Sequence, residues 1–211
     1  MIDFVLHSDK KLLEIVALYG SWVYGFLFAI VFAETGFVVT PFLPGDSLLF
    51  ATGALCATGA LNTPTAIGLL VLAAFSGNAV NYTIGRTVGP RIFAATDQTG
   101  ISHRLLNRDH LKRAHAFFEQ YGGKAVILGR FVPIVRTFVP FVAGAAQMQS
   151  ASFVFFNVVG AGAWVVLCVG AGLLFGNVPI VKNNFSLVTI GIVLVSVLPV
   201  VVEFLRSRRA A

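Results

Sequence analysis

The sequence has little charge. Asp, Glu, Lys and Arg make up only 11% of its 211 residues, whereas 57% are hydrophobic and the mean hydropathy is +0.86. Because a soluble domain carries about 25% charged residues, this composition excludes an ordinary soluble protein. The apolar runs are long and do not alternate with polar residues. The fold class predicted is therefore all-α, a polytopic helical membrane protein.

The chain also lacks the signatures of catalysis and of metal binding. It has no Walker loop, no HExxH motif and no Ser/His/Asp arrangement. Cys56 and Cys168 stand alone in apolar runs, which predicts neither a disulfide nor a metal site. His103, His110 and His115 do not have the spacing of metal ligands. We therefore expect no enzyme activity, no metal and no cofactor.

Positive charge is concentrated in two places. The segment at about 86–124 has an excess of four positive charges, and the sequence RSRR occupies residues 206–209. In a membrane protein such clusters mark cytoplasmic segments, and the net charge of +6 does not indicate nucleic-acid binding. We expect a basic cytoplasmic loop at 86–124 and two cytoplasmic termini.

The chain is predicted to form one membrane domain over residues 1–211. Three apolar runs are expected to span the bilayer, at about 66–85, 151–175 and 185–205. Two further apolar regions contain charges and helix breakers and are expected to be re-entrant, broken helical segments, at about 22–61 and 125–149. Amphipathic stretches at 3–18 and within the basic loop are expected at the membrane interface.

The second broken segment contains AVILGRFVPIVRTFVPFVAGAA at 125–146. A charge at the bilayer centre costs roughly 2.5–3.5 kcal/mol on insertion scales, so Arg130 and Arg136 are candidates for function. On one continuous helix, these arginines would point about 120° apart. Pro133 lies midway between them, and an unwound centre there would turn both toward one cavity.

The first broken segment contains ETGFVVTPFLPGDSLLFATGAL, with Glu34 and Asp46 at membrane depth. Pro-Gly-Asp at 44–46 is a turn signal, and Asp46 is expected to cap a helix that starts at Leu48. The predicted turn or hinge residues of the two segments are Pro41, Pro44, Gly45, Pro133, Pro140 and Gly144.

The two broken segments resemble each other, as a transporter repeat would. Glu34 lies fifteen residues after Tyr19, and Arg136 lies fifteen residues after Tyr121. An inverted repeat would fit this pattern and would place a site at the repeat interface. The alternative is a coincidence between two glycine-rich apolar runs, since the Pro-Phe pairs at 41–42 and 140–141 are offset by three residues from this register. Two interpretations of the four charges stay open. They pair with one another to hold the segments together, or the arginines bind an anionic headgroup while the carboxylates carry protons.

Glu34, the FLPGD sequence at 42–46 and GRFVPIVRTFVPFVAGAA at 129–146 resemble the DedA family of bacterial membrane proteins, whose relatives share the VTT domain. The resemblance covers roughly residues 15–176. It implies a helical fold with two re-entrant segments facing each other, in the bacterial inner membrane. It also implies movement of lipids between leaflets, including the polyprenyl phosphate carrier of the cell wall, with a proposed dependence on the proton-motive force. By this resemblance Glu34, Asp46, Arg130 and Arg136 are functionally essential.

We therefore predict a lipid translocase whose best substrate candidate is undecaprenyl phosphate. Arg130 and Arg136 would bind the phosphate, and Glu34 and Asp46 would exchange protons or pair with the arginines. The expected partners are a phosphate-headgroup lipid and protons, and a homo-oligomer is left open. A proton-coupled cation or drug antiporter and a non-transporting membrane scaffold are the alternatives.

Overall fold

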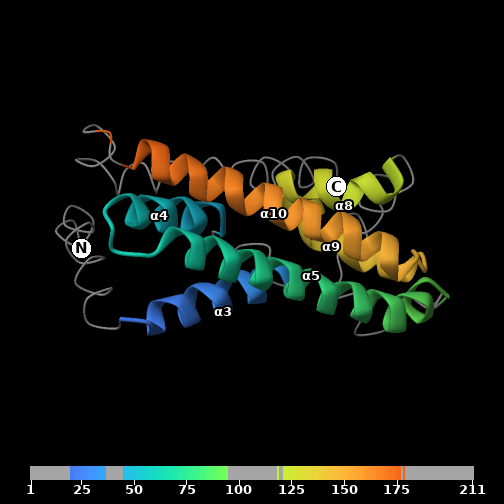
Figure 1. The fold of residues 1–211 in the computed structure, drawn as a ribbon. Coiled ribbons are helices and arrows are strands. Elements are labelled where there is room, and N and C mark those ends of the chain that lie inside the picture. The colour runs from blue at the N-terminus through green and yellow to red at the C-terminus, as the bar shows by residue number, and fades with distance from the viewer. Residues whose placement is uncertain (1–19, 37–44, 95–117, 119–120, 177, 179–211) are drawn as a thin grey trace, which may run out of the picture. The chain divides into compact units, whose positions relative to one another are not determined.

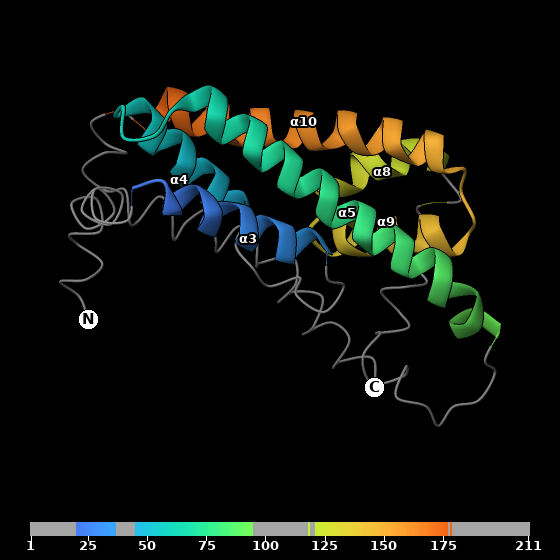
Figure 2. The same cartoon turned by 60° about the horizontal axis from the view of Figure 1, so that its bottom comes forward.

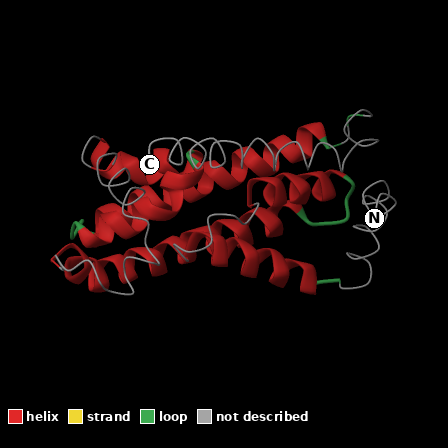
Figure 3. Ribbon diagram, turned by 180° about the vertical axis from the view of Figure 1, so that it is seen from behind, coloured by secondary structure: helices red, strands yellow, loops and turns green. Residues whose placement is uncertain are grey.

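The computed structural model describes residues 20–36, 45–94, 118, 121–176 and 178. Every regular element in these ranges is a helix, and no strand occurs among them (Figure 3). Thr63–Gly89 and Ser150–Phe175 are long and apolar enough to cross a bilayer, and shorter apolar helices accompany them. The predicted all-α membrane fold is confirmed.

The helices are labelled along the chain in Figure 1. They are α3 (Trp22–Gly36), α4 (Gly45–Ala57), α5 (Thr63–Ala94), η1 (Gly122–Lys124), α8 (Ala125–Leu128), η2 (Gly129–Phe131), α9 (Pro133–Ala145) and α10 (Ser150–Phe175). The chain divides into two compact units. Unit 1 comprises Met1–Ile30, Pro44–Leu70 and Val165–Ala211, and unit 2 comprises Val31–Leu43 and Val71–Trp164. Helices α3, α5 and α10 therefore each contribute residues to both units.

In unit 1, α4 packs closely against the second half of α10. An ideal Cβ on Gly53 would lie 2.1 Å from the carbonyl oxygen of Val169, and one on Gly172 would lie 2.0 Å from that of Phe50. Only glycine permits such an approach of two backbones. Before α5, the Asn62 side chain accepts a hydrogen bond from the Thr65 amide at 3.0 Å and so caps the helix.

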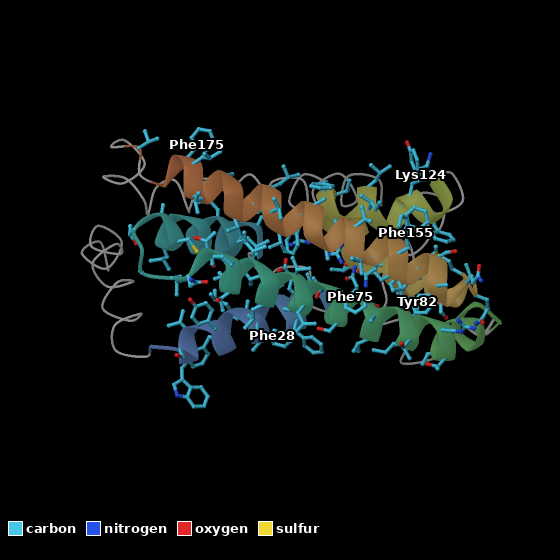
Figure 4. The ribbon with its side chains drawn as sticks, in the orientation of Figure 1. Phe28, Phe75, Tyr82, Lys124, Phe155 and Phe175 are labelled. Carbon is cyan, nitrogen blue, oxygen red and sulfur yellow. The ribbon has the colours of Figure 1, made fainter. Side chains whose placement is uncertain are left out.

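In unit 2, α9 lies against α5, as the views in Figures 1 and 2 agree. An ideal Cβ on Gly85 of α5 would lie 2.1 Å from the carbonyl oxygen of Phe141 on α9, so these backbones also touch. The Tyr82 ring, labelled in Figure 4, stacks on Phe153 of α10 with 4.1 Å between ring centroids. The buried core of this unit consists of Tyr82, Ala125, Val126, Phe138, Val139, Phe141, Val142, Ala143 and Phe153.

Two helix boundaries differ from the sequence prediction. Helix α5 continues to Ala94 instead of ending near residue 85, because the charge of Arg86 is accommodated at the helix surface. The Arg86 guanidinium donates hydrogen bonds to the Tyr82 hydroxyl at 2.9 Å and to the Ser150 hydroxyl at 2.6 Å. Helix α4 begins at Gly45 instead of Leu48, which places Asp46 in its first turn. A carboxylate there is favoured by the helix dipole.

The remaining predicted segments lie largely outside the described residues. These are the amphipathic stretch at 3–18, most of the basic loop at 86–124 and the span at 185–205. The predicted span at 151–175 corresponds to α10, which begins one residue earlier at Ser150.

Candidate functional site

The chain breaks between the two arginines, at Val132. This residue has an extended backbone, with φ −114° and ψ 107°, and it separates η2 from α9. The residue before a proline is disfavoured in the helical conformation, and Pro133 is well placed at the first position of α9. The predicted turn at Pro140 is not present, because Pro140 lies inside α9.

Gly144 also lies inside α9. An ideal Cβ on Gly144 would lie 2.1 Å from the carbonyl oxygen of Tyr82, so this glycine permits α9 to touch α5 inside the helix pair. Among the other predicted turn residues, Gly45 is the first residue of α4, whereas Pro41 and Pro44 lie outside the described residues.

Both arginines lie on one small cavity in unit 2. Its volume is about 10 Å³, which is space for about one water molecule. The side chains around it come from several helices of the unit. They are Glu34, Thr35, Asn78, Arg130, Arg136, Thr137 and Trp164. The described residues therefore place two cations and one carboxylate around the same cavity.

Glu34 and Arg136 form a buried ion pair. Arg136 Nη2 donates to Glu34 Oε1, with side-chain exposures of 8% for the arginine and 0% for the glutamate. Helix α3 supplies the carboxylate and α9 supplies the guanidinium, 102 residues apart in sequence. These are the two residues that follow Tyr19 and Tyr121 by the same interval.

Arg130 has a different environment. Its side chain is buried, with 4% exposure. Its Nη2 donates to the side-chain oxygen of Asn157 at 2.6 Å and to the carbonyl oxygen of Ala74 at 3.3 Å. Within the described part of the chain, no carboxylate pairs with Arg130, and its Nε has no hydrogen-bond partner. Arg130 is thus a buried cation whose hydrogen-bond acceptors, among the described residues, are neutral oxygens.

Asparagines fix the elements around the cavity. Asn81 of α5 donates to the carbonyl oxygens of Thr35 at 3.4 Å and of Thr137 at 2.7 Å. Each of these threonines directly follows a member of the Glu34–Arg136 pair. One fully buried side chain therefore joins the two segments next to their ion pair.

An indole closes the cavity beside both arginines. The guanidinium carbons of Arg130 and Arg136 lie 6.0 and 5.7 Å from the ring centroid of Trp164. At this range the ring attracts a cation, and more strongly when water is excluded. Trp164 is buried, at 2% exposure, so the indole also shields the arginines from solvent.

The structure brings together three of the four predicted charges. Glu34, Arg130 and Arg136 line one cavity in unit 2, whereas Asp46 belongs to unit 1, in the first turn of α4. Asn157 and Trp164 were not predicted from the sequence as site residues. A single asparagine in an apolar span was the available signal for Asn157, because polar side chains there are expensive.

Comparison with known proteins shows the family of this chain. The VTT domain matches residues 43–174, which include Arg130, Arg136, Asn157 and Trp164. Over 213 aligned residues the chain is 51% identical to Protein DedA of Escherichia coli K12, covering 100% of this chain and 95% of that protein. This chain belongs to the DedA family.

Two further bacterial proteins are similar to this chain over shorter stretches. An uncharacterized membrane protein of Mycobacterium tuberculosis is 43% identical, covering 91% of this chain and 83% of that protein. Inner membrane protein YqjA of Escherichia coli K12 is 39% identical, covering 75% of this chain and 70% of that protein. No solved structure matches the chain. With its apolar helices and these relatives, the chain is a membrane protein of a bacterial family.

Proposed function

We propose that this DedA family member moves an anionic lipid between the leaflets of the membrane, without making or breaking a bond. Undecaprenyl phosphate is the best candidate substrate, because the family resemblance points to polyprenyl phosphates and arginine suits the phosphate headgroup. The observation that carries the proposal is the buried Arg130, which lies without a carboxylate partner among the described residues.

An anion would stabilise this cavity. Taking a charge out of water costs several kcal/mol unless an opposite charge compensates it. Arg136 has Glu34 for this purpose, whereas Arg130 has only the oxygens of Asn157 and Ala74. The planar fork of a guanidinium matches two phosphate oxygens and forms charge-assisted hydrogen bonds with them. We infer that the Arg130 fork is where the headgroup binds first.

The cavity has to widen before it takes a phosphate. Its volume of about 10 Å³ holds about one water molecule. Because the Glu34–Arg136 pair links α3 to α9, breaking this pair would free both the space and the second arginine. Protonation of Glu34 removes the charge that holds Arg136. A proton and a phosphate would therefore enter together, which couples lipid movement to a proton gradient.

The other features of the proposal rest on the sequence and on the family. We propose a multi-pass protein in the bacterial inner membrane, with both termini in the cytoplasm. Asp46, in the first turn of α4, would be the second proton-carrying or ion-pairing group.

A reconstitution experiment tests this function. The purified full chain is placed in liposomes that carry a labelled polyprenyl phosphate in one leaflet, with and without an imposed pH gradient. We expect faster transfer than in protein-free liposomes, and its loss in Arg130→Gln and Arg136→Gln. Gly162→Ala is the matched control, because an added Cβ there meets nothing within 4 Å. Failure to move any phosphate lipid, under any gradient, would falsify the proposal.

A proton-coupled cation antiporter is the second candidate, because Glu34 is a carboxylate with 0% exposure. Such a transporter needs the carboxylate to release and bind its ion, whereas the positive charge of Arg130 would only repel a cation. Cation flux that survives Arg130→Gln, together with absent lipid transfer, would favour this candidate. A membrane scaffold, in contrast, would show neither cation flux nor lipid transfer.

A further inference from the structure

We propose that Asn157 determines the charge selectivity of the cavity: it positions Arg130 through a neutral amide and so leaves that positive charge available to the ligand. The inference rests on the proposed function, since it concerns the anion that the site would bind. Two arginines and one glutamate among the described lining residues leave one net positive charge. Arg130 supplies this net positive charge, because Glu34 pairs with Arg136, and Asn157 is in hydrogen-bond contact with Arg130.

The amide of Asn157 is held in one orientation. Its Oδ1 accepts from Arg130 Nη2 at 2.6 Å and from Asn78 Nδ2 at 3.2 Å. Its Nδ2 donates to the carbonyl oxygen of Phe75 at 3.0 Å. Two donors on one side and an acceptor on the other leave a single way to place the amide. The oxygen therefore faces Arg130, and the side chain is fully buried.

One face of α10 is shaped around Arg130. Gly160 and Trp164 follow Asn157 by three and seven residues, which is the spacing of one helix face. An ideal Cβ on Gly160 would lie 3.2 Å from both Cδ and Nε of Arg130, so the glycine leaves room for the arginine stem. Trp164 then lies against the guanidinium. The face supplies an acceptor, a gap and an aromatic ring, and no charge.

A carboxylate of the same size would change the charge of the site while keeping its shape. In an Asn157→Asp variant, one carboxylate oxygen would occupy the position of Oδ1 and would still accept from Arg130 and Asn78. The substitution would also bring a negative charge into hydrogen-bond contact with Arg130, and the net positive charge of the cavity would vanish. An incoming phosphate would then compete with an internal anion. The amide is therefore a selectivity determinant, beyond its part in packing.

The test compares three variants in the full chain, purified in detergent. Trp22→Phe leaves Trp164 as the single tryptophan, and Trp22 is 75% exposed and outside the cavity. The fluorescence of Trp164 is titrated with inorganic phosphate and with a short-chain prenyl phosphate, and thermal unfolding is recorded in parallel. The variants in this background are Asn157→Asp, Asn157→Ala, and Asn157→Asp combined with Glu34→Gln.

We expect Asn157→Asp to bind phosphate at least about tenfold more weakly, because Arg130 then already has a charge-assisted contact. Its unfolding midpoint should fall as well, since the carboxylate oxygen that replaces Nδ2 cannot donate to the Phe75 carbonyl oxygen. Asn157→Ala should also lower the midpoint, since Arg130, Asn78 and Phe75 each lose a buried partner, yet retain most of the affinity, because the net charge of the cavity is unchanged. The combined variant removes one carboxylate and adds another, so its affinity should return to within a few-fold of wild type.

A packing role alone cannot produce that recovery. Wild-type affinity in Asn157→Asp, or weak binding in the combined variant, overturns the inference and leaves the proposed function standing if lipid transfer is normal. If the unsubstituted chain binds neither phosphate probe and moves no lipid, the proposed function fails and the inference fails with it. The prenyl and inorganic probes separate recognition of the headgroup from recognition of the lipid chain.

Discussion

Arg136 of α9 donates to Glu34 of α3 beside a small cavity, and both side chains are buried. Both residues stand fifteen positions after a tyrosine, and Asn81 holds the carbonyl group of the residue that follows each of them. Under the predicted repeat, the contact would join corresponding positions of the two segments. A buried ion pair contributes little net stability, but loss of one partner leaves an uncompensated charge. Because the intact pair adds little stability and a broken pair is costly, a ligand or proton that replaces one partner can switch the contact.

Glu34→Gln should make the stability of the protein depend on phosphate. Removing one partner of a buried pair typically costs about 3–5 kcal/mol, because the remaining charge is uncompensated. An anion that binds the freed Arg136 restores stability by mass action. We expect a lower unfolding midpoint than wild type in phosphate-free buffer, and a larger rise of the midpoint on adding phosphate. Transport by this variant should no longer respond to a pH gradient.

The exchanged pair is the control for this prediction. Glu34→Arg combined with Arg136→Glu retains one charge of each sign and should recover stability. We expect it to remain defective in lipid transfer, because its cation no longer lies on α9. Full transport by the exchanged pair would mean that pairing alone matters and that phosphate chemistry does not.

The sequence predicted the broken segment and its arginines because the cost of charge in a bilayer is a local property. The break at Val132 could be predicted for a similar local reason, because the proline that follows it disfavours a helical backbone at that residue. Which residue each charge pairs with depends, in contrast, on the tertiary fold. Nothing in the spacing determined that Glu34 would take Arg136 and leave Arg130 with an amide. That outcome depends on where α10 places Asn157, 27 residues after Arg130.

Pro140 and Gly144 illustrate the same limit. Both residues are typical of turns, and both lie inside α9. For Gly144 the reason is a neighbouring helix: its missing side chain permits contact with the α5 backbone. A single sequence reports that a glycine is present, but the partner surface decides whether the glycine serves a turn or a close contact.

Arg130→Gln should separate stability from function. Glutamine removes a buried charge that lacks a carboxylate partner among the described residues, and Asn157 Oδ1 still accepts from Asn78. A neutral side chain avoids the desolvation cost of several kcal/mol that an uncompensated buried charge carries. We expect an unfolding midpoint at or above that of wild type, with phosphate binding and lipid transfer lost. A strongly destabilised Arg130→Gln, or one that transfers lipid normally, would show that this charge supports the fold and does not serve a ligand.

Gly144→Ala tests whether the α5–α9 contact positions the cavity. The added methyl would lie 2.1 Å from the Tyr82 carbonyl oxygen and 2.7 Å from the Arg86 amide nitrogen, and neither backbone atom can yield cheaply. Overpacking of this kind costs typically about 1–3 kcal/mol, and α9 would have to shift away from α5 with Arg136 on it. We expect a lower unfolding midpoint and slower lipid transfer. Gly162→Ala on α10 adds the same methyl where nothing lies within 4 Å, so both measurements should match wild type. Equal behaviour of the two variants would mean that α9 does not depend on this contact, and the cavity would then owe its geometry to the Glu34–Arg136 and Asn81 links alone.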